Sequence, residues 1–96
     1  MNTPEILYRT IELVGGDRET THGNKTDNHN NIARLWSGYL QNKFKDTDVS
    51  VSAQDVATMM VLLKIARTQA GSHNVDDYVD ACGYAAIAGE IADTKE

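Results

Sequence analysis

The chain has 96 residues, a mass of 10.6 kDa and a formal net charge of −5, from 9 basic and 14 acidic side chains. Its length predicts a single domain over residues 1–96, and its acidity argues against direct binding of duplex nucleic acid. The single cysteine, Cys82, excludes an internal disulfide. Because neither a membrane span nor a signal peptide is recognisable, we expect a cytoplasmic protein with no membrane partner.

The first predicted helix covers residues 4–14. Thr3 is suited to cap its N-terminus, Pro4 fits the first helical position, and Glu5 favours the positive end of the helix dipole. Gly15 predicts the end of this helix, because glycine is favoured just after a helix C-terminus.

Residues 15–27 contain only glycine and polar residues, which predicts a loop that is long for so small a domain. A second helix is predicted over residues 28–43, because large apolar residues recur there with helical spacing on one stripe. The stripe consists of Ile32, Leu35, Trp36, Tyr39 and Leu40. Gly38 weakens this helix, and a close approach by another helix would explain its presence.

A third helix is predicted over residues 53–69, after a capping box formed by Ser52 and Asp55. It is apolar on nearly every face, which predicts burial on nearly every side. The fourth helix, predicted over residues 75–92, is rich in small residues. We therefore expect an all-α, four-helix-bundle-like domain with a central antiparallel hairpin of the third and fourth helices. Because one short chain cannot cover the third helix, we also expect a homo-oligomer.

Two groups of basic and polar side chains are candidates for binding a phosphorylated ligand. The first group belongs to the polar loop, and comprises Arg18, His22, Asn24 and Lys25. The second group is Lys64 and Arg67, which lie three residues apart on an otherwise apolar helix. Guanidinium and ammonium groups suit phosphate oxygens. The alternative is a solvated loop whose Asp and Asn side chains cap the next helix.

Asp77 and Asp80 lie three residues apart at the start of the fourth helix, and so share a face. Carboxylates that project from neighbouring helices can hold magnesium, which makes this pair the candidate metal site. The alternative is that these acids only complement the helix dipole. We also expect them to lie near Lys64 and Arg67, with the His22 loop closing over the same region, because unpaired buried charges are costly.

Three strings resemble an uncharacterised family of small phage and prophage proteins, over about residues 13–90. They are Gly16-Asp17-Arg18 with His22-Gly23-Asn24 and Asn31-Ile32-Ala33-x-Leu35-Trp36-x-x-Tyr39-Leu40; Asp55-Val56-Ala57-x-Met59-Met60-x-Leu62-Leu63-Lys64-Ile65-Ala66-Arg67; and Asp77-x-x-Asp80-x-x-Gly83-Tyr84-Ala85-Ala86. The helical layout is more distantly similar to the all-α, MazG-like nucleotide pyrophosphohydrolases. In that group, acids on adjacent helices hold magnesium against a nucleoside triphosphate. That group has a Glu-x-x-Glu pair on one helix and a Glu-x-x-Asp pair on the next. Asp77-x-x-Asp80 could stand for the second pair, whereas this chain has no Glu-x-x-Glu.

Two functions of different classes follow. In the first, a small phage-type protein binds a phosphorylated nucleotide, and either sequesters a host signalling nucleotide or hydrolyses a nucleotide as a MazG-like pyrophosphohydrolase with magnesium. In the second, the chain is a protein–protein interaction module that occludes a host defence or replication protein. An oligomeric structural protein is a third alternative. Whether the chain is an enzyme stays open, and a phage-encoded chain would act in the host cytoplasm.

Overall fold

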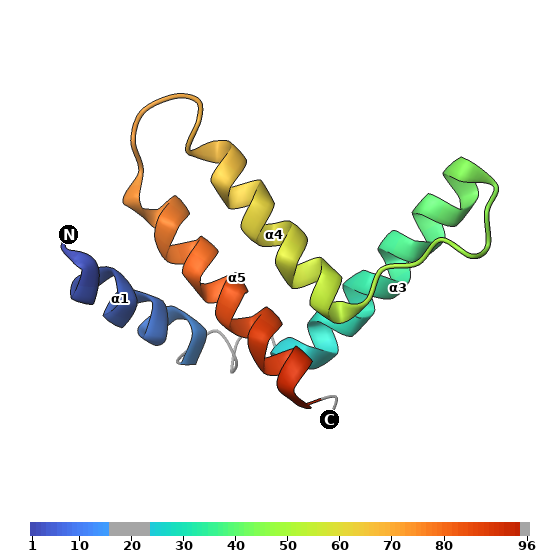
Figure 1. Ribbon diagram of the computed structural model, residues 1–96, viewed down its shortest axis with the longest axis horizontal. Coiled ribbons are helices and arrows are strands. Elements are labelled where there is room, and N and C mark those ends of the chain that lie inside the picture. Colours follow the sequence, from blue (N-terminus) through green and yellow to red (C-terminus); the bar gives the residue numbers. More distant parts are fainter. Residues whose placement is uncertain (16–23, 95–96) are drawn as a thin grey trace.

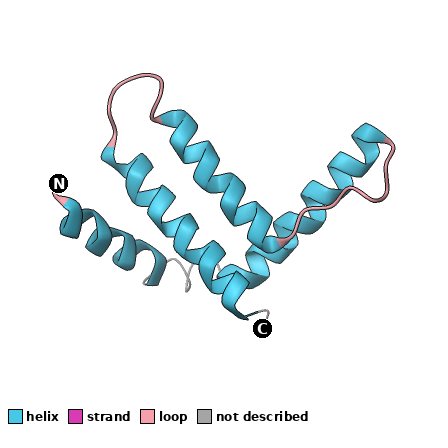
Figure 2. Ribbon diagram, in the orientation of Figure 1, coloured by secondary structure: helices cyan, strands magenta, loops and turns pink. Residues whose placement is uncertain are grey.

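The computed structural model describes residues 1–15 and 24–94, and over these residues it is entirely helical (Figures 1 and 2). Its helices are α1 (Thr3–Gly15), α3 (Lys25–Phe44), α4 (Ala53–Arg67) and α5 (Val75–Thr94). The predicted all-α class is therefore confirmed. None of the described helices is long and apolar enough to cross a membrane.

The first two helices begin earlier than predicted, because asparagine side chains cap them. The Glu5 amide donates to Asn2 Oδ1 (2.9 Å) and the Asn2 amide donates to Glu5 Oε1 (3.1 Å), so that Asn2, rather than Thr3, caps α1. The Asp27 amide donates to Asn24 Oδ1 (3.1 Å). Residues 25–27, predicted to belong to the polar loop, therefore form the first turn of α3.

The start of α4 is as predicted, while the end of that helix and the extent of α5 differ slightly. The Asp55 amide donates to Ser52 Oγ (3.1 Å) and the Ser52 amide donates to Asp55 Oδ2 (2.9 Å), which confirms the capping box. The last helical residue of α4 is Arg67, two residues before the predicted end. Asn74 Oδ1 accepts from the Asp76 amide (3.0 Å) where α5 begins, and α5 continues to Thr94.

The helix α5 lies between α1 and α4, and α3 packs on α4 (Figure 1). A core cluster joins the first part of α4 to the last part of α5, through Ala53, Ala57, Ile87 and Ile91. The C-terminal half of α3 extends away from the other helices, so that α3 and α4 diverge like the arms of a V.

The two glycines within helices have different surroundings. A Cβ atom added to Gly83 in α5 would lie 3.0 Å from Val14 Cγ2, so this glycine lets α1 approach α5 closely. A Cβ atom added to Gly38 in α3 would meet no other atom within 4 Å. The prediction that another helix approaches Gly38 is therefore wrong, because the face of α3 that bears Gly38 borders open space.

The core of a single chain is small, and several apolar faces lie outside it. Val56 and Val79 are the largest fully buried side chains among the described residues. Leu35 and Tyr39 from the predicted apolar stripe of α3 are 66% and 57% exposed. On α4, Met59, Leu62 and Leu63 are also exposed. A single chain thus does not bury α4 on nearly every side.

Candidate functional site

An ion pair joins the end of α4 to the start of α5. Lys64 Nζ lies 3.2 Å from Asp80 Oδ2, and the two side chains are 13% and 22% exposed. The predicted contact between these opposite charges is thus confirmed. Because both groups are mostly removed from water, each needs the other to offset its loss of hydration.

The other two members of the predicted charged cluster, Arg67 and Asp77, do not take part in this ion pair. Arg67 is exposed at the last turn of α4 and Asp77 is half-buried. Neither forms an ion pair with another described residue. Within residues 1–15 and 24–94, no group of three or more His, Cys, Asp or Glu side chains gathers as a metal site would require. The magnesium site at Asp77 and Asp80 therefore stays a prediction.

The predicted loop residues that the structure describes lie at the opposite end of α5. Lys25 Nζ pairs with Glu90 Oε2 at 3.2 Å, and the side chain of Asn24 caps α3. Asp80 and Glu90 are ten residues apart, which corresponds to about 15 Å along the helix. The described candidates thus form two groups rather than one site. Arg18 and His22 lie outside the described residues.

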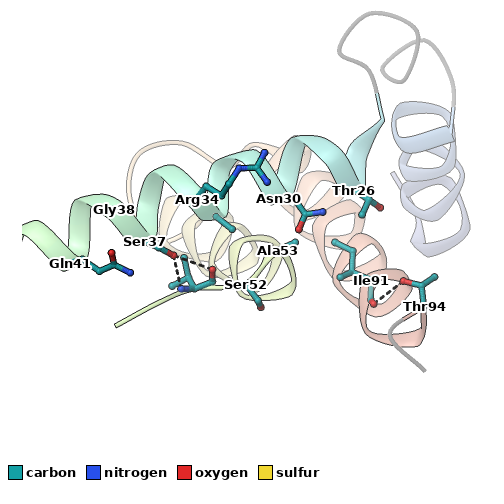
Figure 3. A pocket seen from close by; sticks show the side chains of 12 residues that line it. Thr26, Asn30, Arg34, Ser37, Gly38, Gln41, Ser52, Ala53, Ile91 and Thr94 are labelled. Atoms are coloured by element: carbon teal, nitrogen blue, oxygen red, sulfur yellow. Dashed lines mark hydrogen bonds between the residues drawn. The ribbon is translucent and has the colours of Figure 1, made fainter. Parts of the chain in front are cut away.

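A groove of mixed polar and apolar lining runs along α3, between this helix, residues 51–53 and the C-terminal end of α5 (Figure 3). Its volume is about 600 Å³. The hydrogen-bonding side chains that line it are Thr26, Asn30, Arg34, Ser37, Gln41, Ser52 and Thr94. This volume lies within the range of small-molecule sites.

One wall of the groove is held in place by hydrogen bonds from α3 to the segment before α4. Ser37 Oγ accepts from the Val51 amide (2.9 Å) and lies 3.3 Å from the Val51 carbonyl oxygen. Gln41 Nε2 donates to the Val49 carbonyl oxygen (2.9 Å). These bonds fix residues 49–51 along α3. Gly38 also lines the groove, and its missing side chain keeps that part open.

Arg34 and Asn30 lie on the groove without competing partners. Neither side chain makes a hydrogen bond or ion pair with another described residue. The groove also borders Ser52 and Ala53 at the N-terminal end of α4, where the capping box already engages the Ser52 and Asp55 amides. The arrangement can therefore offer hydrogen-bond donors to an anionic group.

Sequence reasoning missed this groove, although a signal exists. Asn30, Arg34 and Gly38 recur at intervals of four, which places a polar and small-residue face on α3 beside its apolar stripe. That pattern alone is common on solvated helices. The groove also depends on where residues 49–51 run, which helical periodicity does not specify.

His29 is a buried polar residue that links α3 to α5. It is 6% exposed, and its Nδ1 lies 2.8 Å from the Lys25 carbonyl oxygen, which can only accept a hydrogen bond. Nδ1 therefore carries the proton, and the buried Nε2 has no partner among the described residues. The ring lies 6.2 Å from that of Tyr84, between centroids. His29 thus contributes mainly to the helix contact.

Comparisons with known proteins confirm the resemblance to phage proteins. The Gene 55 protein of Mycobacterium phage L5 is 38% identical over 82 residues, which cover 85% of this chain and 49% of that protein. The Gene 55 protein of Mycobacterium phage D29 is 35% identical over 86 residues, which cover 90% and 52%. The chain thus spans about half the length of the curated relatives that it matches.

No solved structure matches the chain. The more distant similarity to MazG-like pyrophosphohydrolases stays a prediction. The family model that matches residues 5–92 is DUF6378, a domain of unknown function. The chain therefore belongs to the DUF6378 family and is related to proteins encoded by phages.

Proposed function

We propose that the chain binds a phosphorylated small molecule of nucleotide type in the groove between α3 and the start of α4. The observation that carries this proposal is Arg34, which lines a groove of about 600 Å³ and whose guanidinium has no ion-pair partner among the described residues. A guanidinium presents donors in a planar fork that matches the oxygens of a phosphate.

The remainder of the groove supports the same class of ligand. Asn30 and Thr26 offer donors and acceptors for a base or a sugar. The N-terminal end of α4 favours an anion through its dipole. Asp55 lies in the first turn of α4, and its negative charge offsets part of the positive potential at this helix end. Arg34 is therefore the main source of positive charge at the groove.

Sequestration fits this groove better than hydrolysis does. Binding needs Arg34 and its polar neighbours. Hydrolysis with magnesium at Asp77 and Asp80 would need a carboxylate that already pairs with Lys64, at the other end of α4. In a phage setting, a binder of this kind would hold a host signalling nucleotide out of circulation.

A thermal-shift screen of nucleotides, cyclic nucleotides and dinucleotides, each with and without magnesium, tests the proposal. A ligand at 100 times its dissociation constant stabilises the chain by about 2.7 kcal/mol. Arg34→Gln should abolish that shift, whereas Arg67→Gln, a matched change at the other end of α4, should leave it intact. If Arg67→Gln abolishes the shift and Arg34→Gln does not, the ligand binds at the predicted α4–α5 charges instead.

A second candidate function is that of a protein–protein interaction module that occludes a host defence or replication protein. The observation that favours it is the set of exposed large apolar side chains on α1, α3 and α4. This alternative would gain support if no nucleotide on the panel stabilised the chain and a purified host protein of either class did.

A further inference from the structure

The polar side chains of α3 that line the groove fall into two sets. Ser37 and Gln41 are hydrogen-bonded to the segment before α4 and hold it in place. Thr26, Asn30 and Arg34 follow one another at intervals of four residues, and so lie in one row along α3. None of these three side chains makes a hydrogen bond or ion pair with another described residue. We call the three residues the α3 row, and their donors and acceptors are available to a ligand.

The most buried residues that line the groove have apolar side chains. Ala33, Ala53 and Ile91 come from α3, α4 and α5, and they are 7%, 6% and 4% exposed. A ligand in the groove therefore contacts both apolar side chains and the hydrogen-bonding groups of the α3 row. This combination suits a nucleobase, whose faces are apolar and whose hydrogen-bonding groups lie at its rim.

Arg34 and Asn30 are neighbours within the α3 row. Side chains on a helix lean toward its N-terminus, so the long side chain of Arg34 reaches toward the turn that bears Asn30. Figure 3 shows the Arg34 side chain extending along α3 in the direction of Asn30. From Thr26 to Arg34 the row spans about 12 Å along the helix axis. This length accommodates one phosphate, one sugar and one base.

We propose that one nucleoside monophosphate unit lies along the α3 row, with its phosphate at Arg34 and its base at Asn30 and Thr26. This inference rests on the proposed function, and it assigns Asn30 as the residue that determines which base binds. The side chain of Asn30 has a carbonyl oxygen that accepts and an NH₂ group that donates. It can therefore form two hydrogen bonds with a base edge on which a donor and an acceptor are adjacent. A base without that pattern in the same position binds more weakly.

Isothermal titration calorimetry with the 5′-monophosphates of adenosine, guanosine, cytidine and uridine tests the inference. The wild-type chain should bind one of them about 5- to 150-fold more tightly than the weakest, which is the range for a two-bond pairing with one base. Asn30→Ala should make the four dissociation constants nearly equal. Arg34→Gln should instead weaken all four by a similar factor and keep their order. The matched control, Asn31→Ala, should change none of them, because Asn31 does not line the groove.

The outcomes separate this inference from the proposed function. Equal affinities for the four nucleotides in the wild-type chain, or an unchanged preference in Asn30→Ala, would overturn the inference alone. So would stabilisation by a dinucleotide or a triphosphate through Arg34 without binding of any monophosphate, because the bound unit would then be larger. If no nucleotide of any kind binds, the proposed function itself fails, and the inference with it. Asn30 is exposed and alanine favours a helix, so Asn30→Ala should fold like the wild-type chain, which circular dichroism verifies.

Discussion

The helices α3 and α5 are both 20 residues long, but α5 buries more of its residues than α3 does. α3 carries a single apolar stripe of large side chains, yet its buried residues are His29 and Ala33. α5 is built largely of small residues, yet five of its residues are buried: Val79, Ala81, Gly83, Ile87 and Ile91. Apolar periodicity thus indicates which face needs cover, whereas burial depends on whether the same chain supplies that cover.

The largest expected effect is a difference in the free energy of unfolding between a substitution in α5 and one in α3. Ile91→Ala in α5, at a residue that is 4% exposed, should lower the free energy of unfolding by about 2–5 kcal/mol through the cavity it leaves. Leu35→Ala in α3 should change it by less than about 0.5 kcal/mol at dilution, where the chain is monomeric. Urea unfolding at low concentration measures both. Equal losses would show that α3 has a core of its own.

The two ion pairs extend the comparison to charges on α5. Asp80→Ala should lower the stability by about 1–3 kcal/mol, because it leaves the mostly buried Lys64 ammonium without a partner. Glu90→Ala should cost less than about 1 kcal/mol, because the pair it forms with Lys25 is more exposed. Double-mutant cycles on the two pairs provide the measurement. A larger coupling for the Lys25–Glu90 pair would contradict the burial argument.

The glycines test the same comparison with one identical substitution. Gly38→Ala in α3 should raise the stability by up to about 1 kcal/mol, since alanine favours the helix and the added methyl group meets open space. Gly83→Ala in α5 should instead lower it by about 1 kcal/mol, because Val14 must move away. Thermal unfolding of both variants gives the signs. A gain at both positions would mean that α1 is loosely held.

The smallest expected effect concerns the end of α3. Lys45 adopts a left-handed conformation there, with φ 53° and ψ 41°. Lys45→Gly should raise the stability by about 0.5 kcal/mol, since glycine adopts this conformation without strain but loses more chain entropy on folding. Lys43→Gly, inside the helix, is the control and should lower the stability by a similar or larger amount. A loss at both positions would argue that the left-handed cap contributes little.

The features that the sequence predicted well depend on neighbouring residues. The four helices and the capping box of Ser52 and Asp55 arise from signals within a few positions. The Lys64–Asp80 pair could be predicted because opposite charges lie near a short connection between two helices. The early start of α3 was missed because its first turn has no large apolar residue to extend the periodic pattern.

The candidate site was harder to predict, because it depends on contacts between distant segments. Arg34 borders a groove since Ser37 and Gln41 hold residues 49–51 along α3. Spacing along one helix contains no information about that path. The predicted ligand residues are basic or polar side chains, and residue type alone does not specify which of them lie together. Lys25 and Lys64 are both paired with acids at different ends of α5, which explains why they do not form one site.

The side-chain caps have a consequence for the order in which the chain folds. Asn2, Asn24, Ser52 and Asn74 each accept a hydrogen bond from an amide two or three residues ahead, so every described helix start is specified by neighbouring residues and needs no distant contact. α4 and α5 are separated by seven residues, from 68 to 74, and can meet at little cost in loop entropy. We therefore expect this helix pair to form early, with α3, which adjoins α4 in the sequence, packing next and α1, whose partner α5 is distant in the sequence, docking last.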